Sequence, residues 1–514
     1  MSHLIILPIV MPAFIAPFIL MVIRHHLDLQ RIFSVAGTLA LVGVAFALTG
    51  QAVSGDIQVY ELGDWPAPFG IVLVLDRLSA LMVLLTSLLA LAVVLYAIGS
   101  DWDKRGYHFH ALFQFQLMGV AGAFLTGDAF NLFVFFEVLL IASYGLMIHG
   151  GGAERLRAGV QYVVYNLLGS TLFLFALGTI YAVTGTLNMA DLAERVAALS
   201  AEDTALIRVG AILLLLVFSI KAAVLPLHFW LPGSYAFAPA PVAALFAIMT
   251  KVGAYAILRM YTLVFGPNEP VSAGLVAEWL LPASLLTLTV GMIGVLGARD
   301  IARMVAFAAI GSMGTLLVAI ALFTPLSTGA AVYYIVHSTL ATAMMFLIAD
   351  MVIERRGGAL QPAQRMPQSG LISALFFAGA IAMAGMPPLS GFLGKLMVLQ
   401  ASYGLPQQTL IWAVILVTSL VAIMGFARAG GIIFWKTLEP EEPDGTSGED
   451  DAIDQAATAS PIAALPFVAC FGLLAGLVAL TIFADPAMRY AEATAAQLFD
   501  TARYIEAVLG STVK

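Results

Sequence analysis

Five residues that can gain or lose a proton lie inside long apolar segments of the chain. Glu137 follows Asn-Leu-Phe-Val-Phe-Phe, Lys221 ends the run Leu-Leu-Leu-Val-Phe-Ser-Ile-Lys, and Lys251, His337 and Lys395 lie in three further apolar segments. Burial lowers the pKa of a lysine and raises that of a glutamate, whereas attraction between opposite charges acts the other way. Groups in this balance change protonation when a neighbouring charge moves. The pattern therefore predicts a proton-transfer relay.

The cost of placing these charges in lipid supports this interpretation. A charge at the centre of a spanning helix costs about 2.5–3.5 kcal/mol, so three lysines and a glutamate facing lipid would cost on the order of 10 kcal/mol. They are expected to face the protein interior. The alternative is that they form buried ion pairs that only fix helix packing, but desolvation offsets the attraction in such pairs. For His337 alone, a neutral hydrogen-bonded histidine is a simple alternative.

The composition indicates a membrane protein. Hydrophobic residues make up 61% of the 514 residues and charged residues 11%, whereas soluble domains have about 25% charged residues. Helix is expected for each apolar segment, because a backbone in lipid must satisfy its own hydrogen bonds. We predict an all-α integral membrane protein with about fourteen transmembrane helices, the first of them not a cleaved signal peptide. The expected spans are 4–23, 32–50, 71–98, 110–126, 128–148, 158–183, 207–226, 239–265, 275–297, 302–323, 329–353, 369–399, 407–435 and 461–483.

Two of these spans contain helix-breaking residues. Pro226 follows Lys221, and Pro387 and Pro388 precede Lys395. Proline frees a backbone carbonyl, and such groups are tolerated at membrane depth where they line a wet cavity. Interrupted helices at corresponding positions of two halves are typical of inverted-repeat transporters. We therefore expect N-terminal helices 1–3 in 1–109, a first five-helix repeat in 110–265, and a second, inverted repeat in 275–436.

The remaining residues are expected to form an acidic cytoplasmic loop, 437–460, and a last helix with a mildly amphipathic C-terminal tail, 461–514. Residues 439–460 hold eight acids and no base. This composition is typical of a solvated flexible loop, and a cation-collecting antenna is the alternative. Basic residues assigned to the loops gather on one side; the positive-inside rule makes that side cytoplasmic and places both termini outside. They are Arg24, Arg31, Lys104, Arg105, Arg155, Arg157, Arg299, Arg303, Arg355, Arg356, Arg365, Arg428 and Lys436, against Arg195, Arg208 and Arg259 opposite.

Several function classes are excluded by the sequence. The single cysteine, Cys470, rules out a disulfide framework and any iron–sulfur or zinc site that needs several cysteines. The segment His149-Gly-Gly-Gly152 lacks the G-x-S-x-G motif that would accompany a lipase oxyanion loop. No P-loop, dinucleotide fingerprint or H-E-x-x-H helix is present. No cofactor and no nucleic-acid partner are expected.

Three long motifs resemble the antiporter-like subunits shared by Mrp-type cation/proton antiporters, respiratory complex I and membrane-bound hydrogenases. The resemblance covers residues 70–436, and within the family it is strongest to the D-type member of the Mrp (Pha) systems. The motifs are Gly127-Asp-Ala-Phe-Asn-Leu-Phe-Val-Phe-Phe-Glu137, Lys221-Ala-Ala-Val-Leu-Pro-Leu-His-Phe-Trp-Leu-Pro232 with Ala244-Leu-Phe-Ala-Ile-Met-Thr-Lys251, and Gly385-Met-Pro-Pro-Leu-Ser-Gly-Phe-Leu-Gly-Lys395.

The resemblance implies a role for each residue. Glu137 and Lys221 would form a regulating pair, Lys251 and His337 a central relay, and Lys395 a terminal proton site. Many relatives have a lysine four residues after the histidine, where this chain has Ala341. The relay would then depend more heavily on His337 and water.

The resemblance also implies a setting. The chain would be a multi-pass protein of the bacterial inner membrane, with partners of the Mrp A, B, C, E, F and G type, and would move protons against Na⁺ or another monovalent cation. The alternative is a proton-pumping subunit of a redox complex such as complex I or a membrane-bound hydrogenase. Ser234-Tyr235 favours the antiporter, because complex I relatives usually have Ala-His there. An inert scaffold is the third possibility.

Overall fold

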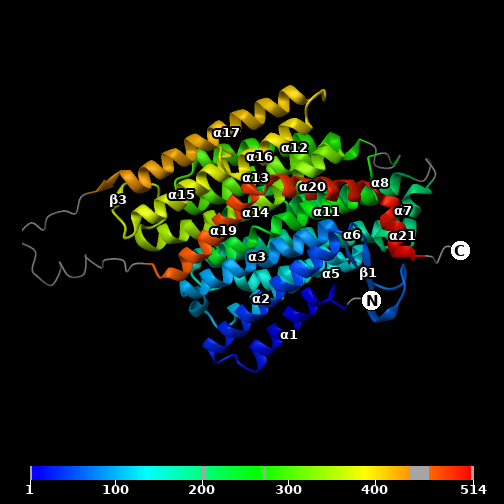
Figure 1. The fold of residues 1–514 in the computed structure, drawn as a ribbon, viewed down its shortest axis with the longest axis horizontal. Helices are drawn as coiled ribbons and strands as arrows, with labels where there is room; N and C mark the ends of the chain where they lie inside the picture. Colours follow the sequence, from blue (N-terminus) through cyan, green and yellow to red (C-terminus); the bar gives the residue numbers. More distant parts are fainter. Residues whose placement is uncertain (1–2, 200–203, 268, 270–273, 439–461, 511–514) are drawn as a thin grey trace, which may run out of the picture.

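A computed structural model describes residues 3–199, 204–267, 269, 274–438 and 462–510. Long helices run side by side along the longest axis of the molecule (Figure 1). Within the described ranges, eleven helices are long and apolar enough to cross a membrane, and three shorter apolar helices accompany them. Together they coincide with the fourteen expected segments.

The helices follow one another in two halves of the chain. Those of the first half are α1 (Leu7–Met21), α2 (Leu27–Ala52), α3 (Arg77–Gly99), α4 (Phe109–Leu125), α5 (Ala129–Met147), α6 (Ala153–Thr184), α7 (Met189–Ala197), α8 (Thr204–Lys221), α9 (Trp230–Phe237), α10 (Ala240–Phe246) and α11 (Met249–Leu263). Those of the second half are α12 (Leu275–Gly297), α13 (Ile301–Ala321), α14 (Pro325–Arg356), α15 (Ser369–Ala384), α16 (Ser390–Ala401), α17 (Gln408–Gly430), α19 (Ala464–Ile482), α20 (Ala484–Phe499) and α21 (Thr501–Leu509).

The expected span 71–98 is wrong at its beginning. Strand β2 (Val72–Leu75) pairs with β1 (Gln58–Glu61) in an antiparallel hairpin, and helix α3 starts only at Arg77. The helix starts there because Asp76 accepts a hydrogen bond from the Ser79 amide at 2.8 Å, in a reciprocal capping box. A second pair of two-residue strands, β3 (Ala363–Gln364) and β4 (Thr437–Leu438), also interrupts the all-helical expectation.

Two of the expected spans, 239–265 and 369–399, are each divided into two helices, and a further break follows the expected span 207–226, because α9 begins only at Trp230. The break between α8 and α9 and the break between α15 and α16 were expected from the prolines. The third break, between α10 and α11, contains no proline. There the amides of Ala247 and Ile248 donate hydrogen bonds to the carbonyls three residues back, those of Ala244 and Leu245. This tightened turn comes just before Lys251.

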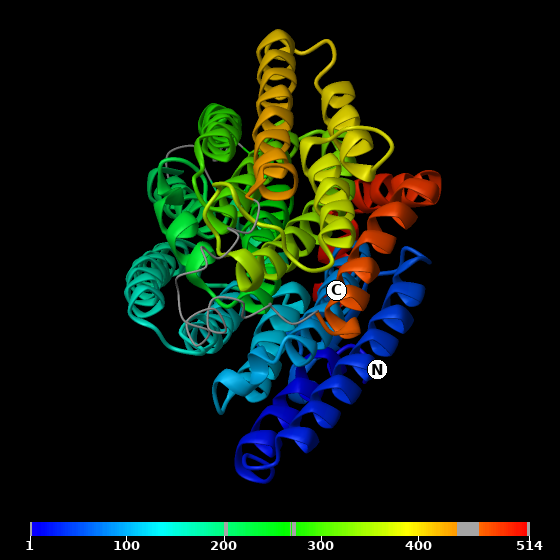
Figure 2. The same cartoon turned by 90° about the vertical axis from the view of Figure 1, so that its left-hand side faces the viewer.

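The interior of the bundle is formed by α10, α11, α13 and α14. Almost all residues of these helices are enclosed by protein. Helices α1 and α2 lie at one rim and α17 at the opposite rim, as the end-on view shows (Figure 2). A functional group on α11 or α14 is therefore surrounded by helices on every side.

The two ends of the bundle differ in what they carry. The end with most of the basic loop residues, called the basic end, contains Gly99, Trp102 and the start of α19, and Gly99 lies directly against Pro466. The hairpin end carries β1, β2 and α21; His3 contacts Tyr60 there, and Arg503 forms an ion pair with Asp56 at 3.2 Å. Both ends of the described chain thus lie at the hairpin end.

One basic residue was assigned wrongly. Arg259, expected in a loop, lies inside α11, is 3% exposed and forms an ion pair with Asp76 at 2.6 Å. Arg77, Arg489 and Arg503, which the loop comparison did not include, belong to the hairpin end. With these changes, the basic end still has more basic side chains than the hairpin end among the described residues. The acidic segment 439–460 lies outside the described residues.

The C-terminal tail is more deeply packed than an amphipathic surface segment. Helix α20 packs on α14 and buries Ala491, Thr494 and Ala495. It is also tied to the start of α3, where the Tyr490 hydroxyl donates to the Arg77 carbonyl at 2.8 Å. The tail therefore belongs to the bundle.

The two ends should be reached from opposite sides of the membrane. Two exposed glutamates are suitable positions for cysteines: Glu154, at the basic end of α6, and Glu194, on α7 at the hairpin end. In a Cys470→Ala background, we expect an impermeant maleimide to label Glu194→Cys in intact cells and Glu154→Cys only in everted vesicles. The same accessibility for both cysteines would contradict the topology.

Candidate proton-transfer site

Glu137 and Lys221 lie near each other without direct contact. Glu137, on α5, is half-buried and accepts a hydrogen bond from the Ser170 hydroxyl of α6. The Lys221 ammonium donates instead to the Asn166 side chain of α6 at 2.7 Å and lies 5.7 Å from the centre of the Phe136 ring. The two charges interact through space, with no ion pair between them. Helix α6 therefore supplies a separate polar partner for each.

The break after α8 places Lys221 at a helix end. Lys221 is the last residue of α8, and Pro226 lies between it and α9. The Trp230 indole donates to the Ile220 carbonyl at 3.0 Å, and Thr287 of α12 accepts from the Leu225 amide at 2.9 Å. Backbone groups released by the break are thus satisfied by neighbouring side chains.

Lys251 is the most enclosed of the five residues. It is 0% exposed, and its ammonium has no hydrogen-bond partner among the described residues. Its helix packs directly on the end of α8, because a Cβ at Gly253 would lie 2.8 Å from the Phe218 carbonyl oxygen. This close approach brings the Lys221 and Lys251 segments together.

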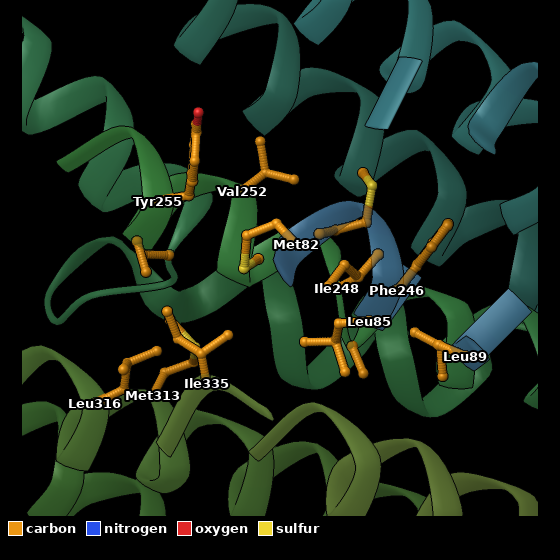
Figure 3. Close-up of a cluster of buried hydrophobic side chains, with 14 of the residues drawn as sticks. Met82, Leu85, Leu89, Phe246, Ile248, Val252, Tyr255, Met313, Leu316 and Ile335 are labelled. Atoms are coloured by element: carbon orange, nitrogen blue, oxygen red, sulfur yellow. The ribbon is translucent and has the colours of Figure 1, made fainter. Parts of the chain in front are cut away.

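Apolar side chains surround the Lys251 segment. Figure 3 shows apolar side chains of α3, the α10–α11 segment, α13 and α14 that pack against one another. Two of them, Ile248 and Val252, lie three residues before Lys251 and directly after it in the sequence. All of the side chains labelled there are buried. Because Lys251 itself is 0% exposed, its ammonium is kept away from lipid and bulk water.

His337 lies on the central helix α14 between two lysines. Its Nδ1 atom is 2.9 Å from the Ser390 hydroxyl at the start of α16, and both Lys251 and Lys395 interact with it electrostatically. Gly391 is needed beside it, since a Cβ there would collide with the Ala382 carbonyl oxygen and the imidazole. Ala341, one turn further along α14, is fully buried.

Lys395 uses the second break directly. Its ammonium donates to the Ala384 carbonyl, at the end of α15, and to the Ser419 hydroxyl of α17, both at 2.8 Å. Gly385 ends α15 in a left-handed conformation, and Pro387 and Pro388 fill the gap before α16. Lys395 lies after its break, whereas Lys221 lies before its own, so the two lysines are not equivalent relative to the breaks.

The structure buries four of the five predicted residues, on α8, α11, α14 and α16, and half-buries Glu137 on α5. No hydrogen bond within the described chain joins one of them directly to the next. Sequence reasoning missed Asn166, Ser170 and Ser419, although a buried asparagine within an apolar span was a visible signal for the first. Within the same ranges, no group of three or more His, Cys, Asp or Glu side chains could hold a metal ion.

The chain is similar to known transport proteins along nearly its whole length. It is 38% identical to the D subunit of a probable K⁺/H⁺ antiporter of Rhizobium meliloti, with 99% of this chain and 98% of the relative covered. It is 37% identical to the D subunit of the Na⁺/H⁺ antiporter of Alkalihalophilus pseudofirmus, with 99% and 100% covered.

Solved structures show the same fold. A chain of the Mrp complex from Dietzia sp. DQ12-45-1b matches with a TM-score of 0.86 and 28% identity, covering 99% of this chain and 100% of that one. A chain of the membrane-bound sulfane sulfur reductase, an archaeal respiratory membrane complex, matches with the same TM-score, 25% identity and the same coverage. The family model described as "NADH:quinone oxidoreductase/Mrp antiporter, TM" matches residues 126–422, which include all five relay residues. This chain therefore belongs to the family of membrane subunits shared by NADH:quinone oxidoreductases and Mrp antiporters.

Proposed function

We propose that this chain is the proton-translocating subunit of a multisubunit monovalent cation/proton antiporter. One observation carries the proposal: three buried lysines, on three different helices, have no carboxylate partner in ion-pair contact within the described chain. Unpaired buried charges are costly, so a purely structural role for them is disfavoured. A lysine held by neutral oxygens can release its proton and leave an amine that still accepts a hydrogen bond. The relatives named as antiporter D subunits support the same function.

In this proposal a proton moves along Glu137, Lys221, Lys251, His337 and Lys395. Each lysine passes from ammonium to amine as it gives up the proton, and His337 accepts it on one ring nitrogen and releases it from the other. Glu137 and Lys221 act as a coupled switch, because loss of the Glu137 charge removes a favourable interaction with the Lys221 ammonium. Lys395 acts as the terminal carrier, anchored by the Ala384 carbonyl and the Ser419 hydroxyl.

The setting follows from the family. We infer a place in the bacterial inner membrane, with both termini outside and with partner subunits of the Mrp A, B, C, E, F and G type. The two five-helix units, 110–265 and 275–436, are proposed as inverted repeats. Na⁺ and K⁺ both occur in the names of the relatives, so the coupled cation is left open between them.

The second candidate is a proton-pumping subunit of a redox-driven complex. The likeness to a chain of an archaeal respiratory membrane complex favours it. The antiporter is preferred because the D-subunit relatives are more similar in sequence, at 38% and 37% identity against 25% for the respiratory-complex chain. Proteins that co-purify in mild detergent distinguish the two: small hydrophobic partners support the antiporter, whereas flavin and iron–sulfur subunits support the redox complex.

Neutralising the switch should stop exchange. We expect Glu137→Gln to abolish cation-induced proton movement in everted vesicles, and Glu137→Asp to keep part of it because the charge survives. Glu154→Gln, an exposed glutamate on α6, is the matched control and should behave like the wild type. Normal exchange by an assembled Glu137→Gln complex would refute the proposed mechanism.

Removing the carrier should have a similar effect. Lys395→Ala leaves the Ala384 carbonyl and Ser419 without the ammonium and should abolish exchange. Lys395→Glu should restore a fraction, because a buried carboxyl can also take up and release a proton. Exchange is measured with a pH-sensitive dye, and assembly by a blot. Equal activity of Lys395→Ala and the wild type would show that Lys395 carries no proton.

Asn166 should be required for Lys221. Asn166→Leu leaves a buried ammonium without its acceptor, at a cost of about 3 kcal/mol or more. We expect at least a tenfold loss of exchange and a lower melting temperature for the complex. Thr171→Val, on the exposed face of the same helix, is the control and should change neither. A normal Asn166→Leu protein would mean that Lys221 finds another acceptor.

The chain alone should not exchange cations. Its buried relay contains lysines and a histidine rather than the cluster of oxygen ligands that binds hard cations. Purified alone in liposomes, it should show no Na⁺- or K⁺-driven pH change, while the complete complex does. Robust exchange by the single subunit would place the cation path within this chain.

A further inference from the structure

A site lined by acidic residues, separate from the five relay residues, lies at the basic end of the bundle. It is a cavity of about 400 Å³ between α3, α14 and the start of α19. At about 30 Å³ for each water molecule, this volume would hold on the order of ten. Its lining includes Tyr96, Asp101, Asp350, Glu354, Ile462 and Pro466.

Asp350 differs from the other two acids of the lining. Asp101 forms ion pairs with Lys104 at 2.8 Å and Arg31 at 3.4 Å, and Glu354 forms one with Arg105 at 2.9 Å. Asp350 is 4% exposed and has no ion pair within the described chain. Its Oδ2 atom accepts from the Tyr96 hydroxyl at 2.8 Å and from the Trp102 indole at 3.0 Å, both neutral donors.

Charged groups around Asp350 act on it only from a distance. The guanidinium groups of Arg105 and Arg155 lie 3.9 and 5.1 Å from the centre of the Trp102 ring, and neither forms an ion pair with the carboxyl within the described chain. Glu354 opposes the Asp350 charge, Arg355 lines the cavity, and Cys470 of α19 is near. A carboxylate in this position is stabilised by two hydrogen bonds but not neutralised, so binding a proton removes an uncompensated buried charge.

Helix α14 links this carboxyl to the relay. Asp350 and His337 are thirteen positions apart on it, a rise of about 20 Å. The buried hydroxyl side chains between them, Ser338, Thr339 and Thr342, lie toward His337, and residues 343–349 are apolar; the Thr342 hydroxyl is enclosed without a hydrogen-bond partner in the described chain. Next to His337, the Ser338 hydroxyl lies 2.8 Å from the Ser312 hydroxyl of α13.

From this arrangement we propose that Asp350 is the residue through which the relay exchanges protons with the aqueous phase at the basic end, with the cavity as its vestibule. The carboxylate takes a proton from water in the cavity and releases it toward His337, or the reverse, so that each transfer moves one proton and breaks no other bond. The inference rests on the proposed function, because it assumes that the relay carries protons.

The test uses the complete complex in proteoliposomes. Asp350→Asn keeps the shape and one acceptor oxygen but cannot carry a proton, and Asp350→Glu keeps the carboxyl. Glu154→Gln, at an exposed position of α6 at the same end of the bundle but outside the cavity, is the matched control. We expect Asp350→Asn to slow exchange at least tenfold and to remove its dependence on pH at the basic end. Asp350→Glu should keep more than a third of the rate, with a shifted pH profile, and Glu154→Gln should stay within twofold.

A spectroscopic measurement separates proton binding from a structural role. A pH step should give an infrared difference band of a protonated carboxyl that is absent in Asp350→Asn and present in Glu154→Gln. Normal exchange and an unchanged band in Asp350→Asn would overturn the inference, as would an assembled Asp350→Glu complex without activity. A change only in the apparent cation affinity would also overturn it and make Asp350 a cation ligand. If the wild-type complex moved no protons with Na⁺ or K⁺, the proposed function would fail, while the infrared band would still report on Asp350.

Discussion

The structure depends on how a positive charge is held in an apolar interior. Lys221 and Lys395 are not neutralised by carboxylates but are hydrogen-bonded to neutral oxygens, from Asn166 in one case and from Ala384 and Ser419 in the other. A neutral acceptor stabilises an ammonium less than a carboxylate does, and it leaves the deprotonated amine well accommodated. Each of these lysines can therefore keep a hydrogen bond to its partner in both protonation states.

The helix breaks serve this constraint in different ways. At the second break, the Ala384 carbonyl accepts from Lys395 because no amide of α16 reaches it. At the first, the Ile220 carbonyl is occupied by the Trp230 indole, so Lys221 depends on the α6 side chain. The same device, a proline-interrupted helix, thus gives a backbone anchor to one lysine and a side-chain anchor to the other.

Much of this arrangement was predictable, because the signals were local. A charge in a run of twenty apolar residues stands out, and prolines mark interruptions, so the spans, Glu137, Lys221 and the broken positions followed from the sequence. The β1–β2 hairpin did not, since Val72–Leu75 is as apolar as the helix after it and only the Asp76 cap shows where the helix starts. The buried ion pair of Arg259 was not predicted either, because its partner Asp76 is distant in sequence. Pairings of this kind depend on which helices pack together, and the periodicity of a single helix does not show it.

The central lysine behaves differently from the two on either side of it. In the proposed relay, Lys221 and Lys395 each break a hydrogen bond to a fixed protein acceptor when the ammonium turns toward the next group. Lys251 has no such acceptor in the described chain and is fully buried. Transfer of a proton from Lys251 to His337 would therefore break no hydrogen bond between Lys251 and the described chain. Within the proposal, the two anchored lysines are suited to store a proton, whereas Lys251 is suited to pass it on.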